Sequence, residues 1–366
     1  VYIDTESSSN QHMLVTGSTG TGKTNFLKIW IKQNIMRQTV VLDYSDSFPE
    51  FENTQVINIF ETSEIQGFFD NLTDDTIGPI ADAIQGAWRL GEAQRTAIVK
   101  ALRIMVDSKD IHEIVSMASA DVFQSYLKRN GGVYERSWAL FATILNSKCG
   151  NKGEQIAMRL LELVSAVSKS KISERECSIN SAAVKIVKFP VESCGLNSHL
   201  VELYLWKFWM KELKDRNPVT VILDECQDLN WKKGSIAERL LSQGRKFGIG
   251  IVLSTQFLSE NFPKRIIHHF QQSGLRVVFA PPEGEAKEIA QSFDAINWKN
   301  WVMTLKRLRV GSCAACGSLK VNGRTNKQKV IVLVPSYEKM VQDLKKDREK
   351  TVENQRNLNG TEILKR

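Results

Sequence analysis

Four residues near the start of the chain have the types and spacing of a phosphate-binding loop. Gly17, Gly22, Lys23 and Thr24 fit the pattern GxxxxGK[ST], between a strand-like apolar run and a segment with helical periodicity. Glycines let the backbone N–H groups point at phosphate oxygens, the lysine reaches the β and γ phosphates, and the hydroxyl binds Mg²⁺. The predicted nucleotide-binding residues are Gly17, Thr19, Gly20, Thr21, Gly22, Lys23, Thr24 and Asn25.

Two carboxylates end the apolar run VTVILDE, residues 219–225. Side chains alternate along a strand, so Asp224 and Glu225 are expected to have different roles. Asp224 is predicted to hold Mg²⁺ with Thr24, and Glu225 to activate the water that attacks the γ phosphate. Without the phosphate loop, an acidic pair that merely caps a strand would be the better interpretation. A separate glutamate indicates ATP hydrolysis, rather than phosphoryl transfer to a small acceptor.

Two further groups complete the predicted catalytic set of Glu225, Lys23, Arg245 and Gln256. Gln256 ends the run GIGIVLSTQ, where an amide can donate to the γ phosphate or the water. Arg245 precedes that run, and a guanidinium stabilises charge that develops on phosphate. The chain has one phosphate loop, so Arg245 is expected to act from a neighbouring subunit, with Arg276 as second choice. A strand-end amide and a surface cation are the plainer alternatives.

The elements that position these residues alternate between strand-like and helical patterns, which predicts an α/β fold with a mainly parallel sheet. Strands are expected near 12–17, 39–46, 55–60, 183–189, 219–225, 248–256 and 275–281. Residues 61–180 have helical patterns only and are predicted to be an insertion. Asn322-Gly323 predicts a hairpin turn. The predicted domains are an ATPase core (1–60 and 181–335), the helical insertion (61–180) and a charged, solvated C-terminal tail (336–366).

Composition limits the class of protein. The 366 residues carry a formal net charge of +8, which favours a polyanionic partner. Six scattered cysteines do not form a disulfide framework, and no apolar run reaches the roughly 20 residues that cross a bilayer. These features predict a cytoplasmic protein without a membrane partner. The first residue is Val1, which suggests a piece of a longer chain.

In its order of motifs the sequence resembles the HerA and FtsK group of P-loop ATPases. LVTGSTGTGKTNFL, VVLDYSDSF, VILDECQDLN and GRKFGIGIVLSTQ carry the resemblance, which covers about 1–60 and 183–335. It implies a RecA-like core, a hexameric ring and passage of double-stranded DNA through the pore. Asp43 falls at the family's second-strand acid, but Asp46, Ser47 and Phe48 depart from its Gly-Glu-aromatic pattern. HerA-like modules also occur in bacterial restriction, the DptH-like ATPases of phosphorothioation-dependent restriction among them.

Weaker signals are interpreted as structural. Cys313 and Cys316 form a lone CxxC and are expected to pack in the core, and His268 and His269 to be ordinary surface or core residues rather than metal ligands.

Cations beyond strand ends are candidates for sequence-independent contact with DNA phosphates, with solvated surface charge as the alternative. They are Lys232, Lys233, Lys264, Arg265, Lys306, Arg307 and Arg309.

These observations lead to two hypotheses. The first is an ATPase that uses ATP and Mg²⁺ to translocate or unwind DNA as a ring of identical subunits, with a nuclease or other restriction subunits as further partners. The second is a nucleotide-switched module that assembles or gates protein partners without moving DNA, which the long helical insertion favours. A small-molecule kinase is disfavoured by Glu225 and by the length of the chain.

Overall fold

The computed structural model describes most of the chain. The described residues are 2–3, 10–34, 38–43, 46–51, 54–107, 137–170, 184–190, 196–258, 262–317, 319–321, 324–326, 329–343 and 346.

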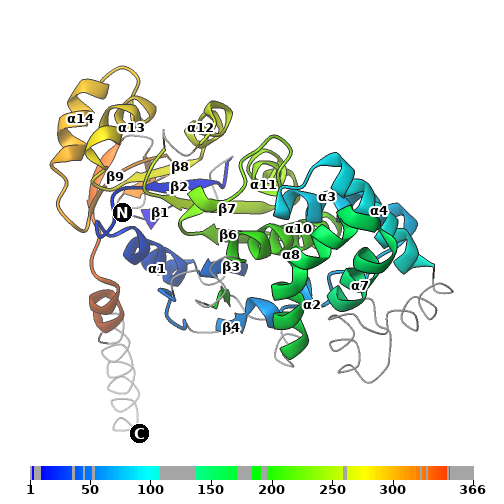
Figure 1. Cartoon of the computed structure of the whole chain (residues 1–366). Coiled ribbons are helices and arrows are strands. Elements are labelled where there is room, and N and C mark those ends of the chain that lie inside the picture. Colours follow the sequence, from blue (N-terminus) through cyan, green and yellow to red (C-terminus); the bar gives the residue numbers. More distant parts are fainter. Residues whose placement is uncertain are drawn as a thin grey trace, which may run out of the picture.

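A nine-stranded sheet in the order β12-β9-β8-β2-β7-β6-β3-β5-β4 forms the centre of the molecule (Figure 1). The run from β8 to β4 is parallel, and β9 and β12 extend it antiparallel. Its strands are β2 (Met13–Thr16), β3 (Gln38–Asp43), β4 (Thr54–Asn58), β5 (Val184–Lys188), β6 (Val219–Leu223), β7 (Ile249–Thr255), β8 (Leu275–Val278), β9 (Ser312–Gly317) and β12 (Val330–Leu333). The predicted mainly parallel α/β fold is confirmed.

A smaller sheet brings the first residues of the chain beside a hairpin of residues 319–326. β1 (Tyr2–Ile3) pairs with β10 (Leu319–Val321), which pairs antiparallel with β11 (Arg324–Asn326). This is the predicted C-terminal hairpin. The Asn322-Gly323 turn itself lies outside the described residues.

The central strands are apolar because both faces of the sheet are covered, as is usual for parallel sheets. Side chains alternate between two cores: Leu14 joins a large core on one face, whereas Met13 and Val15 join a smaller core on the other. Helix α1 (Lys23–Gln33) covers the smaller core. The helices that follow β5 in the sequence lie on the other face (Figure 1). They are α10 (Asn197–Asp215), α11 (Ile236–Gln243), α12 (Lys264–Gln271), α13 (Ala286–Phe293) and α14 (Trp298–Lys306).

The described residues between β4 and β5 are helical, in the segment predicted to be an insertion. The helices are α2 (Ser63–Gln66), α3 (Ile77–Trp88), α4 (Glu92–Val106), α7 (Trp138–Lys148) and α8 (Gly150–Lys169), with 3₁₀ turns at 59–61 and 74–76. Trp138 is 1 % exposed, stacks on Phe68 and donates its indole N–H to the Ile65 carbonyl. These helices share the large core with α10 and the sheet, so their packing is continuous with it.

Two further observations bear on the sequence predictions. Residues 337–343 are helical, but Tyr337 and Met340 pack on the smaller core, so the start of the tail is docked and not merely solvated. Residues after 346 lie outside the described part. Within the described residues, no helix has both the length and the apolarity to span a membrane.

Candidate nucleotide-binding and hydrolysis site

The loop of residues 17–22 connects the carboxyl end of β2 to α1 and packs against the residues after β8. Gly17 and Gly22 have φ of 150° and 116°, a region that L side chains rarely adopt. A Cβ on Gly17 would lie 2.6 Å from Phe279 Cβ, and one on Gly22 would lie 3.2 Å from the Phe279 ring. The Ser18 N–H donates to the Ala280 carbonyl at 2.8 Å. Both glycines are therefore needed for the backbone to pass Phe279.

Lys23 folds back into this loop. Its Nζ donates to the Gly17 carbonyl at 2.8 Å and to the Ser18 carbonyl at 3.2 Å, and the residue is 5 % exposed. Burial lowers the pKa of Lys23, while the nearby Glu225 and Asp224 carboxylates oppose this. The ammonium thus occupies the centre of a curled loop, where a phosphate group would neutralise its desolvated charge.

Thr24 and Asp224 meet from two different elements. Thr24 Oγ1 at the start of α1 donates to Asp224 Oδ2, just after β6, at 3.2 Å. Asp224 is 6 % exposed, and burial raises its pKa, which the Thr24 hydrogen bond opposes. A hydroxyl and a carboxylate are hard oxygen donors of the kind that Mg²⁺ prefers. These residues therefore fit a magnesium ion beside the phosphate loop.

Glu225 is turned toward β7 by its backbone. β6 ends at Leu223, and Glu225 has a left-handed conformation with φ 50° and ψ 48°. The expectation that strand alternation separates the two acids is therefore wrong in its premise, because both acids follow the strand. Gln256 Nε2 donates to Glu225 Oε1 at 3.1 Å and to Oε2 at 3.2 Å.

A chain of hydrogen bonds links Glu225 to the phosphate loop. Thr19 Oγ1 donates to Gln256 Oε1 at 2.8 Å, while the amide nitrogen of Gln256 faces Glu225. Gln227, which no sequence motif indicates, donates from Nε2 to Glu225 Oε2 at 2.7 Å. Its position two residues after the acid gives no periodic signal, because the contact depends on the left-handed turn at Glu225.

Two predicted nucleotide-binding side chains hold the loop in place. Thr21 Oγ1 donates to the Ser18 carbonyl at 2.7 Å, and the Thr21 carbonyl accepts from the Gly311 N–H at 3.0 Å. The Asn25 amide donates to the Pro335 carbonyl and accepts from the Tyr337 N–H, both at 2.8 Å. The Asn25 side chain is thus committed to the C-terminal segment, and its backbone alone remains for a nucleotide.

Arg245 lies away from these residues. It is exposed on a 3₁₀ turn, residues 244–247, that precedes β7, whereas Gln256 follows the same strand. The seven residues of β7 span roughly 20 Å. Arg245 therefore does not reach the phosphate loop of its own chain. The second choice, Arg276, is engaged inside the chain, where its guanidinium donates to the Ser292 carbonyl.

Asp43 has a structural role in the part of its loop that is described. Its carboxylate accepts the N–H groups of Ser47 and Phe48, both at 3.1 Å, and Phe48 is buried in the smaller core. The acid at the end of β3 therefore shapes the turn that follows.

The weaker predictions have mixed outcomes. Cys313 and Cys316 are buried on opposite faces of β9, as expected for packing, and burial raises the pKa of Cys313 to about 12. In the described chain no cluster of three or more His, Cys, Asp or Glu residues could bind a metal. His268 is exposed and His269 half-buried on α12.

Arg265, a candidate for DNA contact, forms a 2.7 Å ion pair with Glu238 of the same chain. The other candidate cations are exposed: Lys232, Lys233, Lys264, Lys306, Arg307 and Arg309. Of these, Lys306 also pairs with Glu283 at 3.5 Å.

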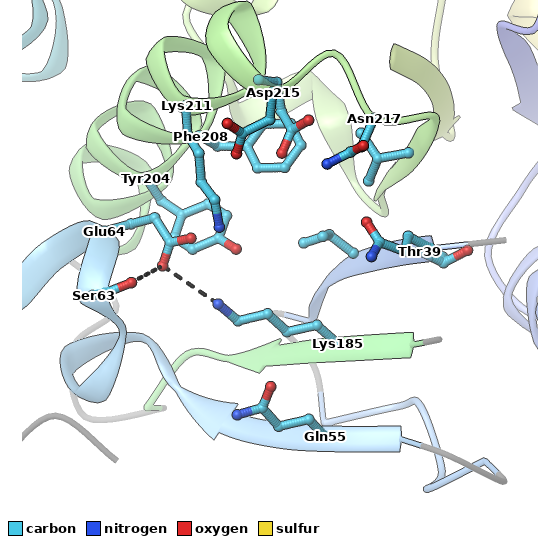
Figure 2. A pocket seen from close by; sticks show the side chains of 14 residues that line it. Thr39, Gln55, Ser63, Glu64, Lys185, Tyr204, Phe208, Lys211, Asp215 and Asn217 are labelled. Carbon is cyan, nitrogen blue, oxygen red and sulfur yellow. Dashed lines mark hydrogen bonds and ion pairs between the residues drawn. The ribbon is translucent and has the colours of Figure 1, made fainter. Parts of the chain in front are cut away.

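A separate polar cavity lies at the opposite, amino ends of the parallel strands, where β3, β5 and β6 begin (Figure 2). It has a volume of about 190 Å³ and lies beneath the end of α10. Figure 2 shows Lys185 directed at Glu64, to which it is paired at 3.4 Å. The phosphate loop follows the carboxyl end of β2, so this cavity is not part of the nucleotide site.

Comparisons with known proteins agree with this geometry. A family model described as "Helicase HerA, central domain" matches residues 1–184 of the 366. The plasmid coupling protein TrwB in complex with ADP and Mg²⁺ is 13 % identical, with a TM-score of 0.57 over 89 % of this chain and 86 % of that chain. VirB4 of Thermoanaerobacter pseudethanolicus is 12 % identical, with a TM-score of 0.60 over 90 % of each chain. No curated protein matches the chain. The structural likeness confirms the predicted RecA-like P-loop core.

Proposed function

The chain belongs to the HerA central-domain family of P-loop ATPases, and from this premise we propose that it hydrolyses ATP to move DNA. The observation that carries the proposal is the meeting of three elements at one end of the parallel sheet. The phosphate loop, the Thr24–Asp224 pair and the Glu225–Gln256 pair all follow carboxyl ends of β2, β6 and β7. Ligands of open α/β sheets bind at this edge.

Each residue has one role in the proposed reaction. The loop N–H groups and Lys23 bind the β and γ phosphates, and Thr24 and Asp224 hold Mg²⁺, which neutralises phosphate charge when bound. Glu225 accepts a proton from the attacking water. Gln256 contacts both Thr19 and Glu225, so it connects the occupancy of the loop to the position of the base.

The site is completed by a second subunit in this proposal. Arg245 lies at the far end of β7 from its own phosphate loop, so it serves the site of a neighbour in a ring of identical chains. A heterologous contact that repeats around a closed rotation gives such a ring. The net charge of +8 supports a polyanion as the partner that passes through it, and the family resemblance supports double-stranded DNA as that polyanion. A place in bacterial restriction stays a prediction from the sequence resemblance.

Steady-state ATP hydrolysis tests the proposal, measured with and without double-stranded DNA at two salt concentrations. Lys23→Ala is the blank, and light scattering reports the oligomer. DNA is expected to stimulate turnover, and the stimulation to weaken at high salt, because phosphate contacts release counterions. Turnover by an assembled ring that is indifferent to DNA would favour the partner-gating alternative, for which the helices between β4 and β5 offer a surface outside the site. No turnover above Lys23→Ala under any condition would refute the ATPase.

A further inference from the structure

The Glu225 carboxylate is held between two amides that are anchored differently. Gln256 donates to both carboxylate oxygens and is tied to Thr19 on the phosphate loop. Gln227 donates to Oε2 at 2.7 Å, and its own Oε1 lies 3.0 Å from the Thr255 hydroxyl. One amide, which follows β7, is therefore tied to the loop that binds nucleotide, and the other, which follows β6, is tied to the last residue of β7.

The orientation of the Gln227 amide follows from the chemistry of its neighbours. An ionised carboxylate only accepts hydrogen bonds, so the amide nitrogen must face Glu225. The amide oxygen then faces the Thr255 hydroxyl. Thr255 is fully buried, and its hydroxyl also lies 3.0 Å from the Phe257 carbonyl. A flipped amide would set its oxygen against the Glu225 carboxylate, so the donor of Gln227 stays directed at that carboxylate.

The backbone explains why Glu225 needs such a support. Its left-handed conformation costs roughly 1 kcal/mol or more for a residue with a Cβ. The Glu225 N–H donates to Asp224 Oδ1 at 3.1 Å, which fixes the start of the side chain but not its end. The carboxylate position is therefore set by the two amides.

We infer that Gln227 is the positioning residue that keeps Glu225 directed at the attacking water when Gln256 turns to the nucleotide. The inference rests on the proposed ATPase function. As Gln256 leaves, Oε2 keeps the Gln227 hydrogen bond and Oε1 is open to water. The water oxygen bonds to the γ phosphorus, the bond to the β–γ bridging oxygen breaks, and Oε1 takes the proton from the water. Gln227 itself touches neither water nor phosphate.

Two substitutions separate this role from a structural one. Gln227→Leu removes the donor at similar size and is expected to lower kcat about 10- to 100-fold, the effect of one hydrogen bond to a charged group. The KM for ATP, the ATP affinity measured by calorimetry and the unfolding midpoint are expected to stay close to those of the wild type. Gln291→Leu, on the exposed surface of α13, is the matched control.

Gln227→Glu provides a readout that a packing residue would not change. At pH 8 a carboxylate at 227 repels Glu225 and the variant is expected to turn over slowly. As the pH falls, protonation of that side chain restores a donor, so the ratio of variant to wild-type kcat is expected to rise. A kcat for Gln227→Leu within twofold of the wild type, a parallel loss of ATP affinity, or a ratio that does not change with pH would overturn the inference. If Gln227→Leu does not fold, the inference is tested by Gln227→Glu alone, which has nearly the same shape as the wild type: the ratio of its kcat to the wild-type kcat must rise as the pH falls. A wild-type protein without turnover would refute the proposed function instead.

Discussion

At the scale of residues, the candidate site depends on acids that have different surroundings. Asp224 is buried beside the Thr24 hydroxyl, whereas Glu225 is half-buried and its carboxylate accepts hydrogen bonds from the Gln227 and Gln256 amides. The first arrangement suits a cation, and the second leaves a carboxylate directed at the space beside the loop. The two acids are adjacent in sequence, yet the left-handed backbone at Glu225 gives their carboxylates different surroundings.

Glu225→Gln tests this division. The substitution keeps the shape of the side chain and removes the base, so kcat is expected to fall about 10²- to 10⁴-fold. ATP affinity is expected to remain close to that of the wild type, because the loop, Lys23 and Thr24 are unchanged. Calorimetry and single-turnover hydrolysis measure the two quantities. Brisk turnover by the variant would remove Glu225 from the role of base.

The phosphate loop and the two acids could be predicted from the sequence because their spacing is local. Gly17 to Thr24 form one continuous pattern, and Asp224 directly follows a strand. Gln227 and Thr255 could not be predicted, since their contact with the site depends on a turn and on the register of β6 beside β7. The hydrogen bond from the Asn25 amide to the Pro335 carbonyl joins residues 310 positions apart, so no local sequence pattern predicts it.

At the scale of elements, the sequence predicts the individual strands but does not predict which strands lie next to each other in the sheet. The sequence predicted the strands, whereas the position of β2 between β7 and β8 emerges only from tertiary packing. The helices between β4 and β5 illustrate the same limit. Their apolar faces were visible as periodicity, yet their shared core with α10 depends on contacts such as that of Trp88 with His199, whose rings lie 5.1 Å apart.

A buried acid on α10 makes the stability of this layer depend on pH. Glu202 is 3 % exposed and accepts the Asn230 N–H at 2.8 Å, and burial raises its pKa to about 7. Because the folded state binds the proton more tightly than the unfolded state, stability from this group is greatest below pH 4.5. It is lost as the pH rises from 4.5 through 7, by up to about 3 kcal/mol.

Glu202→Gln is expected to remove this dependence, since the amide oxygen still accepts from Asn230 without a charge. Urea unfolding at pH 5 and pH 8 measures the free energy of unfolding of both proteins. The variant is expected to gain stability over the wild type at pH 8 and to gain much less at pH 5. Glu288→Gln, on the exposed surface of α13, is the control. An equal difference at both pH values would contradict the assignment.

At the scale of the whole molecule, the distance between the two halves of the proposed site is decisive. The phosphate loop lies at the carboxyl end of the parallel strands, and Arg245 precedes the amino end of β7. One chain therefore has its nucleotide-binding residues at the carboxyl ends of the parallel strands and the exposed guanidinium of Arg245 at their amino ends. A ring in which each chain completes the site of its neighbour uses both ends, and it makes the ATPase a property of the assembly.

Mixing two inactive variants tests this arrangement. Lys23→Ala loses the phosphate ligand and Arg245→Ala loses the guanidinium, so each is expected to be nearly inactive alone. In randomly mixed rings about a quarter of the contacts between neighbours unite an intact Lys23 with an intact Arg245, so activity is expected to reappear. Steady-state hydrolysis of the mixture, with light scattering to show that rings form, gives the answer. If both variants assemble and the mixture stays inactive, Arg245 does not act across the subunit boundary. If Arg245→Ala alone keeps full turnover, the arginine has no part in the reaction and another cation must stabilise the phosphate charge.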